Sequence, residues 1–311
     1  MNSNKLGSNS NRKSSNRNSN RNSNRKSSNR KSSNRNSNRK SRKNSNRTLR
    51  IKSKKISSNN NNILSNVECN SIETILSVSQ SEKFLKELGK GTYGIAFKGC
   101  FDLPECKRGI SVKYISISSR YGKGYHDLNH PSNVEYRLGL ALSKLVYADI
   151  TPHINITFGN LKCSFNKLKH NKTFKQSKAN EWLKLTQNKL NNNEIYPKIN
   201  VVFNELANMD LKTYVLEQQN NLDHLDHLII FFQFCYSLTC IQYYFKNFKH
   251  LDIKPNNLLV ELIDIPVKRT NKYVAYNIFG KTFYLPQTKY VMKLYDFDFG
   301  YSDAFKNKKI T

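Results

Sequence analysis

Residues 250–260 read HLDIKPNNLLV, and the chain changes character abruptly where this stretch begins. The preceding segment, LIIFFQFCYSLTCIQYYF at 228–245, is made almost wholly of apolar and aromatic residues. A change from such a run into a His-x-Asp-x-Lys-Pro-x-Asn pattern predicts a loop that carries polar side chains out of a hydrophobic core. Pro255 stiffens this loop, because the proline ring fixes its own backbone φ angle.

The polar residues of this loop suit the transfer of a phosphoryl group. Asp252 can accept a proton from a hydroxyl nucleophile, and Lys254 can neutralise charge on the group in transit. Asn257 lies five residues after Asp252, which lets it turn back toward a metal ion. Downstream, KLYDFDFG ends a predicted strand with Asp296 and Asp298, and either carboxylate could chelate Mg²⁺ between phosphates.

A glycine-rich motif lies upstream, in KFLKELGKGTYGIAFKGC at 83–100. A dinucleotide-binding fingerprint needs its glycines between a strand and a helix. Here Gly89, Gly91 and Gly94 lie between two predicted strands, which argues against that fold. Glycines in such a hairpin allow backbone amides to approach phosphates, and an ordinary glycine-rich turn is the alternative.

Lys113 and Glu135 follow the glycine motif in order. Lys113 lies in a predicted strand at 109–117, and Glu135 lies near the start of a predicted helix at 132–148. Ser132 is the expected N-cap of that helix, and Glu135 has the spacing of a capping box. Alone, each would be an ordinary surface residue or cap. Together they suggest an ion pair in which Glu135 positions Lys113 against the α- and β-phosphates of a nucleotide.

In this order, the glycine hairpin, Lys113, Glu135, HLDIKPNN and DFDFG resemble the motifs of a eukaryotic-type serine/threonine protein kinase. The resemblance covers about residues 84–305, and the set is specific although each motif alone is weak. The Asn- and Lys-rich composition and the DFDFG variant are similar to kinases of poxviruses and giant DNA viruses. The resemblance implies an α+β, protein-kinase-like bilobal fold, with an antiparallel β N-lobe and a mostly helical C-lobe. It also implies ATP, Mg²⁺ and a protein substrate.

The resemblance further implies the roles of single residues. Asp252, Lys254 and Asn257 would be catalytic, and Asn257 with Asp296 would hold metal. Alignment on KLYDF favours Asp296, whereas a literal Asp-Phe-Gly favours Asp298, which is kept as the alternative. The residues implied to bind the nucleotide lie in the glycine hairpin, at the ion pair and in a hinge: Leu88, Gly89, Lys90, Gly91, Thr92, Tyr93, Gly94, Ile95, Ala96, Lys113, Glu135, Glu205 and Ala207.

Charge divides the chain into a tail and a domain. Residues 1–55 carry 19 Lys and Arg and no Asp or Glu, so they hold +19 of the net +30, and the rest holds 30 − 19 = +11. Residues 1–62 repeat a Ser-Asn-Arg theme with almost no apolar residue, which predicts disorder. Such a tail is either a solvated segment or a weak contact for nucleic acid or an acidic partner.

The domain boundaries follow from these patterns. Residues 63–83 are predicted to be a linker and 84–311 a kinase domain. Its N-lobe would span about 84–206, with a Lys- and Asn-rich insertion at 162–198. The C-lobe, at about 207–311, is expected to be partial, because no Ala-Pro-Glu motif follows in the eleven residues after Gly300.

Two departures from the family pattern open alternatives. Leu251 replaces the Arg that many kinases use to pair with a phosphorylated activation loop, so that switch is not expected here. The short C-lobe keeps open a catalytically inactive pseudokinase or split-gene fragment that acts as a nucleotide-binding or interaction scaffold. Another alternative keeps the fold but phosphorylates a small molecule. Lys254 favours a protein kinase, because small-molecule relatives often lack that lysine.

Cysteine use and hydropathy predict the surroundings of the chain. The six cysteines form no Cys-x-x-Cys pair, so neither a metal site nor a disulfide framework is expected. We therefore predict a reducing intracellular compartment, either host cytoplasm or a virion if the chain is viral, or the nucleus if the tail is a targeting signal. The N-terminus lacks the apolar region of a signal peptide. The 228–245 segment is short and interrupted by polar residues, which favours a core helix over a transmembrane segment.

Overall fold

The computed structural model describes residues 69, 86–91, 94–100, 109–122, 125–170, 179–264 and 272–310. The predicted tail at 1–62 and most of the predicted linker at 63–83 lie outside the described residues. Thr92 and Tyr93 of the glycine motif lie outside them as well.

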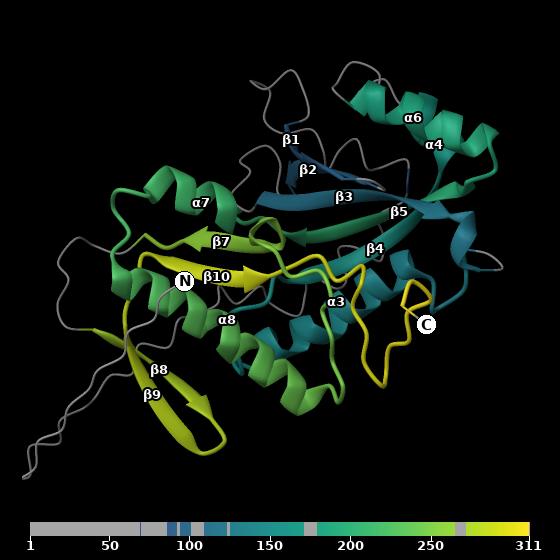
Figure 1. Cartoon of the computed structure of the whole chain (residues 1–311). Helices are drawn as coiled ribbons and strands as arrows, with labels where there is room; N and C mark the ends of the chain where they lie inside the picture. Colours follow the sequence, from purple (N-terminus) through teal and green to yellow (C-terminus); the bar gives the residue numbers. More distant parts are fainter. Residues whose placement is uncertain are drawn as a thin grey trace, which may run out of the picture. The chain divides into compact units, whose positions relative to one another are not determined.

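The first half of the described chain is built on an antiparallel sheet with the strand order β1-β2-β3-β5-β4 (Figure 1). Its register places Lys113 between Ala96 on one side and Val202 on the other. β-branched and aromatic residues are frequent in the two central strands, β3 and β5, and such side chains pack well on a pleated surface. The antiparallel sheet predicted for this half is confirmed. The strands are β1 Glu87–Lys90, β2 Gly94–Cys100, β3 Gly109–Ser118, β4 Thr157–Ser164 and β5 Ile195–Glu205.

Helix α3, Pro131–Tyr147, packs against this sheet and carries Glu135 to it. The N-cap is His130, whose ring nitrogen accepts a hydrogen bond from the Ser132 backbone N–H. Pro131 at the first helical position loses nothing, since that N–H has no partner within a helix. The prediction of Ser132 as cap was therefore wrong, and so was the capping-box role of Glu135, whose carboxylate accepts from Lys113 instead.

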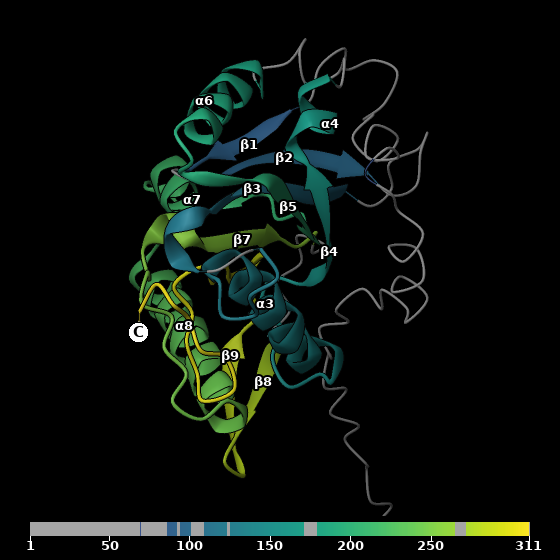
Figure 2. The ribbon, with the colours of Figure 1, turned by 90° about the vertical axis from the view of Figure 1, so that its right-hand side faces the viewer.

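The insertion predicted at 162–198 begins in β4, contains two helices and ends in β5. The helices are α4, Phe165–His170, and α6, Ala179–Asn191, and residues 171–178 lie outside the described part. Figure 2 shows both helices beside β1 and β2. Trp182 of α6 is buried, and its ring centroid lies 6.3 Å from that of Tyr114 on β3. The insertion therefore extends the core of the first half, and Trp182 is its contact from α6.

The second half contains a three-stranded sheet with the order β10-β7-β6. Helix α7, Leu211–Gln218, contacts β7, and helix α8, His224–Tyr244, contacts β10 (Figure 1). Between β7 and β10 the chain forms the separate hairpin β8–β9. The halves meet at a parallel bridge between Ile154 and Leu294. The strands are β6 Met209–Asp210, β7 Leu258–Leu262, β8 Tyr273–Ile278, β9 Lys281–Pro286 and β10 Tyr290–Leu294.

Helix α8 is the apolar segment that precedes the decisive loop. Among the described helices it alone is long and apolar enough to cross a membrane, by length and composition. Ile229 and Ile241 are nevertheless buried, and the side-chain oxygen of Gln233 accepts from the Met292 N–H at 2.9 Å. These contacts attach α8 to β10 and support the prediction of a core helix. Its other face leaves Phe231 and Tyr243 exposed.

The prediction against disulfides was wrong. Cys69 and Cys163 form one, and Cys100 is disulfide-bonded as well. Cys163 lies on β4, 94 residues after Cys69, so no local spacing in the sequence could reveal the pair. Cys235 and Cys240 are free. The compartment predicted from cysteine spacing stays a prediction.

Candidate active site

The glycine hairpin, β1 and β2 with their turn, forms one edge of the site. The Gly91 N–H donates to the Gly94 carbonyl oxygen at 2.8 Å and closes the turn. A glycine is required at 94, because a Cβ there would lie 2.6 Å from the carbonyl oxygen of Tyr114 on the neighbouring strand. The ammonium of Lys90 lies 3.0 Å from the Glu181 carboxylate of α6. Lys90 therefore contacts the insertion rather than the polar centre described below.

The other predicted residues of the hairpin lie along the same two strands. Leu88 and Gly89 belong to β1, and a Cβ on Gly89 would meet no atom within 4 Å. Ile95 and Ala96 belong to β2. The side chain of Ile95 is only 1% exposed, so it packs in the core and can offer a nucleotide its backbone alone.

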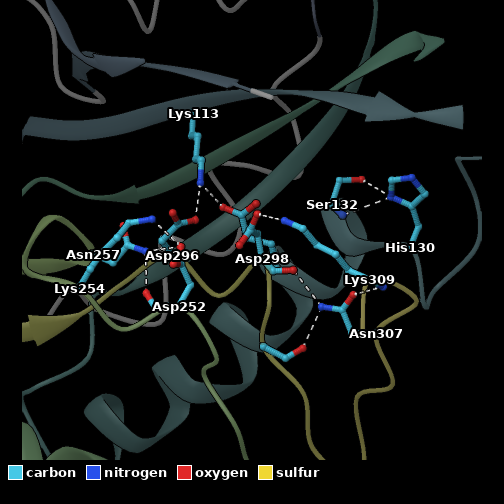
Figure 3. Close-up of polar contacts among 12 residues, drawn as sticks. Lys113, His130, Ser132, Asp252, Lys254, Asn257, Asp296, Asp298, Asn307 and Lys309 are labelled. Atoms are coloured by element: carbon cyan, nitrogen blue, oxygen red, sulfur yellow. Dashed lines mark hydrogen bonds and ion pairs between the residues drawn. The ribbon is translucent and has the colours of Figure 1, made fainter. Parts of the chain in front are cut away.

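Lys113 is the centre of a buried ion-pair triad (Figure 3). Its Nζ lies 2.6 Å from Oε1 of Glu135 and 2.8 Å from Oδ1 of Asp296. Lys113 comes from β3, Glu135 from α3, and Asp296 from the segment after β10. The structure thus forms the predicted pair of Lys113 with Glu135 and adds Asp296 to it.

Burial and shared charge set the protonation of this triad. Burial alone would lower the pKa of Lys113, but the carboxylates of Asp296 and Glu135 hold it well above its ordinary value. Burial raises the pKa of Glu135 to about 7, against the attraction of Lys113. Burial also acts to raise the pKa of Asp296, yet Lys113 holds it below its ordinary value. One ammonium group therefore pairs with two carboxylates. As the pH falls, Glu135 takes up a proton before Asp296 does.

The catalytic-loop residues form a second cluster beside the triad (Figure 3). The Lys254 ammonium donates to Oδ2 of Asp252 at 2.7 Å. The Asn257 amide donates to the Asp252 carbonyl oxygen at 2.9 Å and to its Oδ2 at 2.8 Å. A 3-10 turn, Pro255–Asn257, brings Asn257 back toward Asp252. The structure thus brings together the three residues predicted to be catalytic.

His250 ties this loop to the segment that carries Asp296. Its ring is 3% exposed, and Nε2 lies 2.9 Å from the carbonyl oxygen of Tyr295. Burial lowers the pKa of His250, so a neutral ring with its proton on Nε2 fits this contact. Leu251 and Asp296 both have left-handed φ angles, of 61° and 62°. Residues other than glycine rarely adopt this conformation, and it concentrates at functional sites.

Three carboxylates converge next to this loop. One oxygen from each of Asp252, Asp296 and Asp298 lies within 4.8 Å of the others. Burial, with the Asp296 charge, raises the pKa of Asp298, and its Oδ1 is buried without a hydrogen-bond partner. Carboxylate oxygens are preferred ligands of Mg²⁺, so this donor set fits a divalent cation. Both predicted alternatives, Asp296 and Asp298, belong to the cluster, and Asn257 adjoins it through Asp252.

In the predicted hinge, Glu205 already makes contacts within the protein, through its backbone N–H and its carboxylate. Glu205 was predicted to contact the nucleotide. Its N–H donates to the Ile156 carbonyl oxygen at 2.7 Å, so this N–H is already engaged within the protein. The Glu205 carboxylate accepts from the buried ammonium of Lys293 at 2.6 Å. Ala207 lies beyond the end of β5, and it is the hinge position that we retain for contact with a nucleotide base.

Sequence reasoning missed three residues of this site. The Tyr295 ring centroid lies 5.4 Å from the Lys113 Nζ. Asn307 is fully buried and donates to the carbonyl oxygens of Asp298 and Gly300, and Lys309 pairs with the Asp298 carboxylate. Tyr295 directly precedes a predicted metal ligand, which was a usable signal. Asn307 and Lys309 stand in a lysine-rich stretch in which nothing distinguishes them.

The raised pKa of Glu135 gives a pH dependence of stability. A carboxyl group that binds its proton more tightly in the folded chain stabilises the fold fully below its unfolded pKa of 4.5, and this contribution is lost as pH rises through about 7. Relative to Glu135→Gln, the wild type should therefore lose free energy of unfolding between pH 5 and pH 8. The loss should be at most about 3 kcal/mol. Urea denaturation across this range measures it, and parallel pH profiles of the two proteins would contradict it.

Known proteins with similar sequences are named as serine/threonine protein kinases. No family model matches the chain. Over 195 residues it is 27% identical to "Putative serine/threonine-protein kinase R400" of Acanthamoeba polyphaga mimivirus, covering 61% of this chain and 42% of that protein. Over 223 residues it is 26% identical to "Probable serine/threonine-protein kinase 380R" of Invertebrate iridescent virus 6, covering 71% of this chain and 37% of that protein.

A solved kinase domain, that of PF14_0431, also aligns with the chain. The alignment covers 70% of this chain and 51% of that domain, at 15% identity and a TM-score of 0.40, a likeness too low to support an argument. The matched parts make up about two fifths of the length of the two viral relatives. These relatives confirm the resemblance that the motifs indicated. The chain is similar to serine/threonine protein kinases of large DNA viruses.

Proposed function

We propose that the chain is an ATP- and Mg²⁺-dependent serine/threonine protein kinase. The observation that carries this proposal is the position of Lys113, which bridges Glu135 and Asp296 beside the cluster of Asp252 and Asn257. A cation for phosphates, an oxygen-rich metal site and a carboxylate base then stand within one site. Similarity to viral serine/threonine kinases supports the same chemistry.

The residues around the nucleotide would bind and orient it. Backbone amides of the glycine hairpin would cover the phosphates, and Lys113, held by Glu135, would contact the α- and β-phosphates. Ala207 would offer its backbone to the base. Asn257 and Asp296, with Asp298 as the alternative, would hold Mg²⁺. When bound, the ion would neutralise charge on the β- and γ-phosphates.

The transfer itself would be an in-line displacement. The hydroxyl oxygen of a serine or threonine would form a bond to the γ-phosphorus, and the bond from that phosphorus to the bridging oxygen of ADP would break. Asp252 would accept the hydroxyl proton. Lys254, which donates to Asp252 at 2.7 Å, would turn its charge to the phosphoryl group in transit.

A phosphotransfer assay tests the proposal. The full chain is incubated with γ-labelled ATP and Mg²⁺, with and without a basic generic protein, and label in protein serine or threonine is quantified. We expect Mg²⁺-dependent labelling of the added protein, of the chain itself, or of both. A folded chain that binds ATP but labels no protein would support a nucleotide-binding scaffold instead. Transfer to small hydroxyl compounds alone would support the small-molecule alternative.

A further inference from the structure

The segment 301–310, here called the latch, folds back onto the carboxylate cluster. Asn307 is fully buried, and its amide donates to the carbonyl oxygens of Asp298 and Gly300, each at 2.9 Å. The N–H of Lys308 donates to the Asn129 carbonyl oxygen at 3.0 Å, and its ammonium pairs with the Asp127 carboxylate. The latch is thereby fixed at the two residues that directly precede Lys309.

That next residue, Lys309, reaches into the candidate metal site (Figure 3). Its Nζ lies 2.6 Å from Oδ2 of Asp298 and 3.3 Å from the ring centroid of Phe299. The Lys309 side chain is only 10% exposed, which is unusual for a lysine near the surface. This ammonium therefore holds one carboxylate oxygen of Asp298, Oδ2, while Oδ1 has no hydrogen-bond partner.

Each carboxylate of the cluster has a lysine partner. Asp296 pairs with Lys113, Asp252 with Lys254, and Asp298 with Lys309. Three negative charges converge within 4.8 Å, and like charges so close repel one another unless cations stand between them. A divalent cation that enters the cluster is therefore repelled by the ammonium groups already in place, and it competes with Lys309 for Oδ2 of Asp298.

Lys309 is the lysine whose displacement changes the site least. Lys113 lies on the central strand β3 and has Glu135 as a second carboxylate partner, so it is fixed whatever Asp296 binds. The Lys254 side chain is 52% exposed and belongs to the catalytic loop itself. Lys309 is carried by a segment of turns and bends without helix or strand. Its withdrawal would leave Asp298 with both oxygens ready to accept metal.

We propose that Lys309 and a divalent cation exclude one another at Asp298, so that metal binding to the cluster releases the latch. This inference rests on the proposed function only in that it takes the carboxylate cluster for the metal site. In the metal-free chain the ammonium neutralises the third carboxylate, and the latch stays closed. With metal bound, Asp298 becomes a ligand, and Lys309 turns to solvent.

Mn²⁺ binding to the full chain, without nucleotide, tests this exclusion. Free Mn²⁺ is measured by electron paramagnetic resonance during titration of the wild type and single variants. Lys309→Met removes the competing charge and should tighten Mn²⁺ binding about tenfold, as expected for a close charge in direct competition. Lys309→Arg keeps the charge and should keep the wild-type affinity.

Lys308→Met is the matched control. It removes the same charge one residue away, but its partner is Asp127, outside the cluster. Its Mn²⁺ affinity should change much less than that of Lys309→Met, because the Lys308 backbone N–H still holds the latch to Asn129. Asp298→Asn should weaken binding and should also cancel the effect of Lys309→Met in the double variant. Equal tightening by Lys308→Met and Lys309→Met, or no tightening by Lys309→Met, would overturn the proposal.

Hydrogen exchange gives a second readout that does not depend on affinity. Saturating Mn²⁺ should speed amide exchange within the latch of the wild type and leave Asp298→Asn unchanged. Exchange that slows on metal binding would overturn the release of the latch. If Mn²⁺ affinity responds to Lys309→Met while the chain transfers no phosphate, the kinase proposal fails and the exclusion stands. If the chain transfers phosphate but its Mn²⁺ affinity does not change in Lys309→Met, the kinase proposal stands and the exclusion fails.

Discussion

Asp252→Asn is expected to abolish phosphotransfer by the full chain while nucleotide binding persists. The asparagine side chain has nearly the same shape and can still accept a hydrogen bond from Lys254 or Asn257, so the loop should keep its geometry. It cannot take up the proton of a hydroxyl nucleophile at neutral pH. Loss of a positioned general base lowers the rate by about 10²- to 10⁴-fold.

Single-turnover transfer from γ-labelled ATP, combined with a fluorescent nucleotide titration, separates the two effects of Asp252→Asn. Asp303→Asn serves as the control, because Asp303 contacts Asn247 and Lys306 outside the site. It should transfer phosphate at the wild-type rate. Transfer by Asp252→Asn at the wild-type rate would remove Asp252 from the mechanism. Loss of nucleotide affinity would make it a residue of the binding site instead.

Lys113→Met should give the largest loss of stability among single changes in the site. The substitution leaves the carboxyl groups of Glu135 and Asp296 buried and facing one another without their cation. Removing one partner of a buried ion pair lowers the free energy of unfolding by about 3–5 kcal/mol. Nucleotide binding should weaken at the same time, because the cation for the phosphates is gone.

Urea denaturation measures the effect of Lys113→Met, with Lys90→Met as the matched control. Lys90 belongs to the same sheet, but its partner Glu181 is 75% exposed, and such surface pairs contribute at most about 1 kcal/mol. Adding Glu135→Gln to Lys113→Met should recover part of the lost stability, since it removes one uncompensated carboxylate. If Lys113→Met and Lys90→Met are equally stable, the triad does not stabilise the fold.

The sequence predicted well what depends on short spacing. The spacing within HLDIKPNN predicted that Asn257 turns back toward a metal ion. The turn Pro255–Asn257 brings its amide onto Asp252, one of the three clustered carboxylates. Lys113 and Glu135 were predicted as an ion pair because they follow the glycine motif in the order typical of phosphoryl transfer, and the structure forms that pair. The apolar helix at 224–244 followed from composition, since few polar side chains interrupt it.

Features that depend on distant contacts could not be predicted in this way. His130 became the helix cap because its ring also contacts the Ser118 carbonyl oxygen, a tertiary contact that local cap preferences do not contain. The N–H of Glu205 is taken by Ile156, and Cys69 finds Cys163, only once the sheet has formed. Local patterns could therefore reveal neither the engaged N–H of Glu205 nor the disulfide.

The long reach of the Lys113–Asp296 pair has a consequence for how the chain is made. The two residues are 183 positions apart, and contacts of such long range form late, because loop closure must precede them. A ribosome adds about 5–20 residues per second, so on the order of ten seconds or more separates the synthesis of the two charges. During that interval the first sheet can fold. The candidate metal ligands Asp296 and Asp298 are still missing, because they follow β10 in the chain. The candidate site can therefore assemble only after Asp296 and the rest of the segment that follows β10 have left the ribosome.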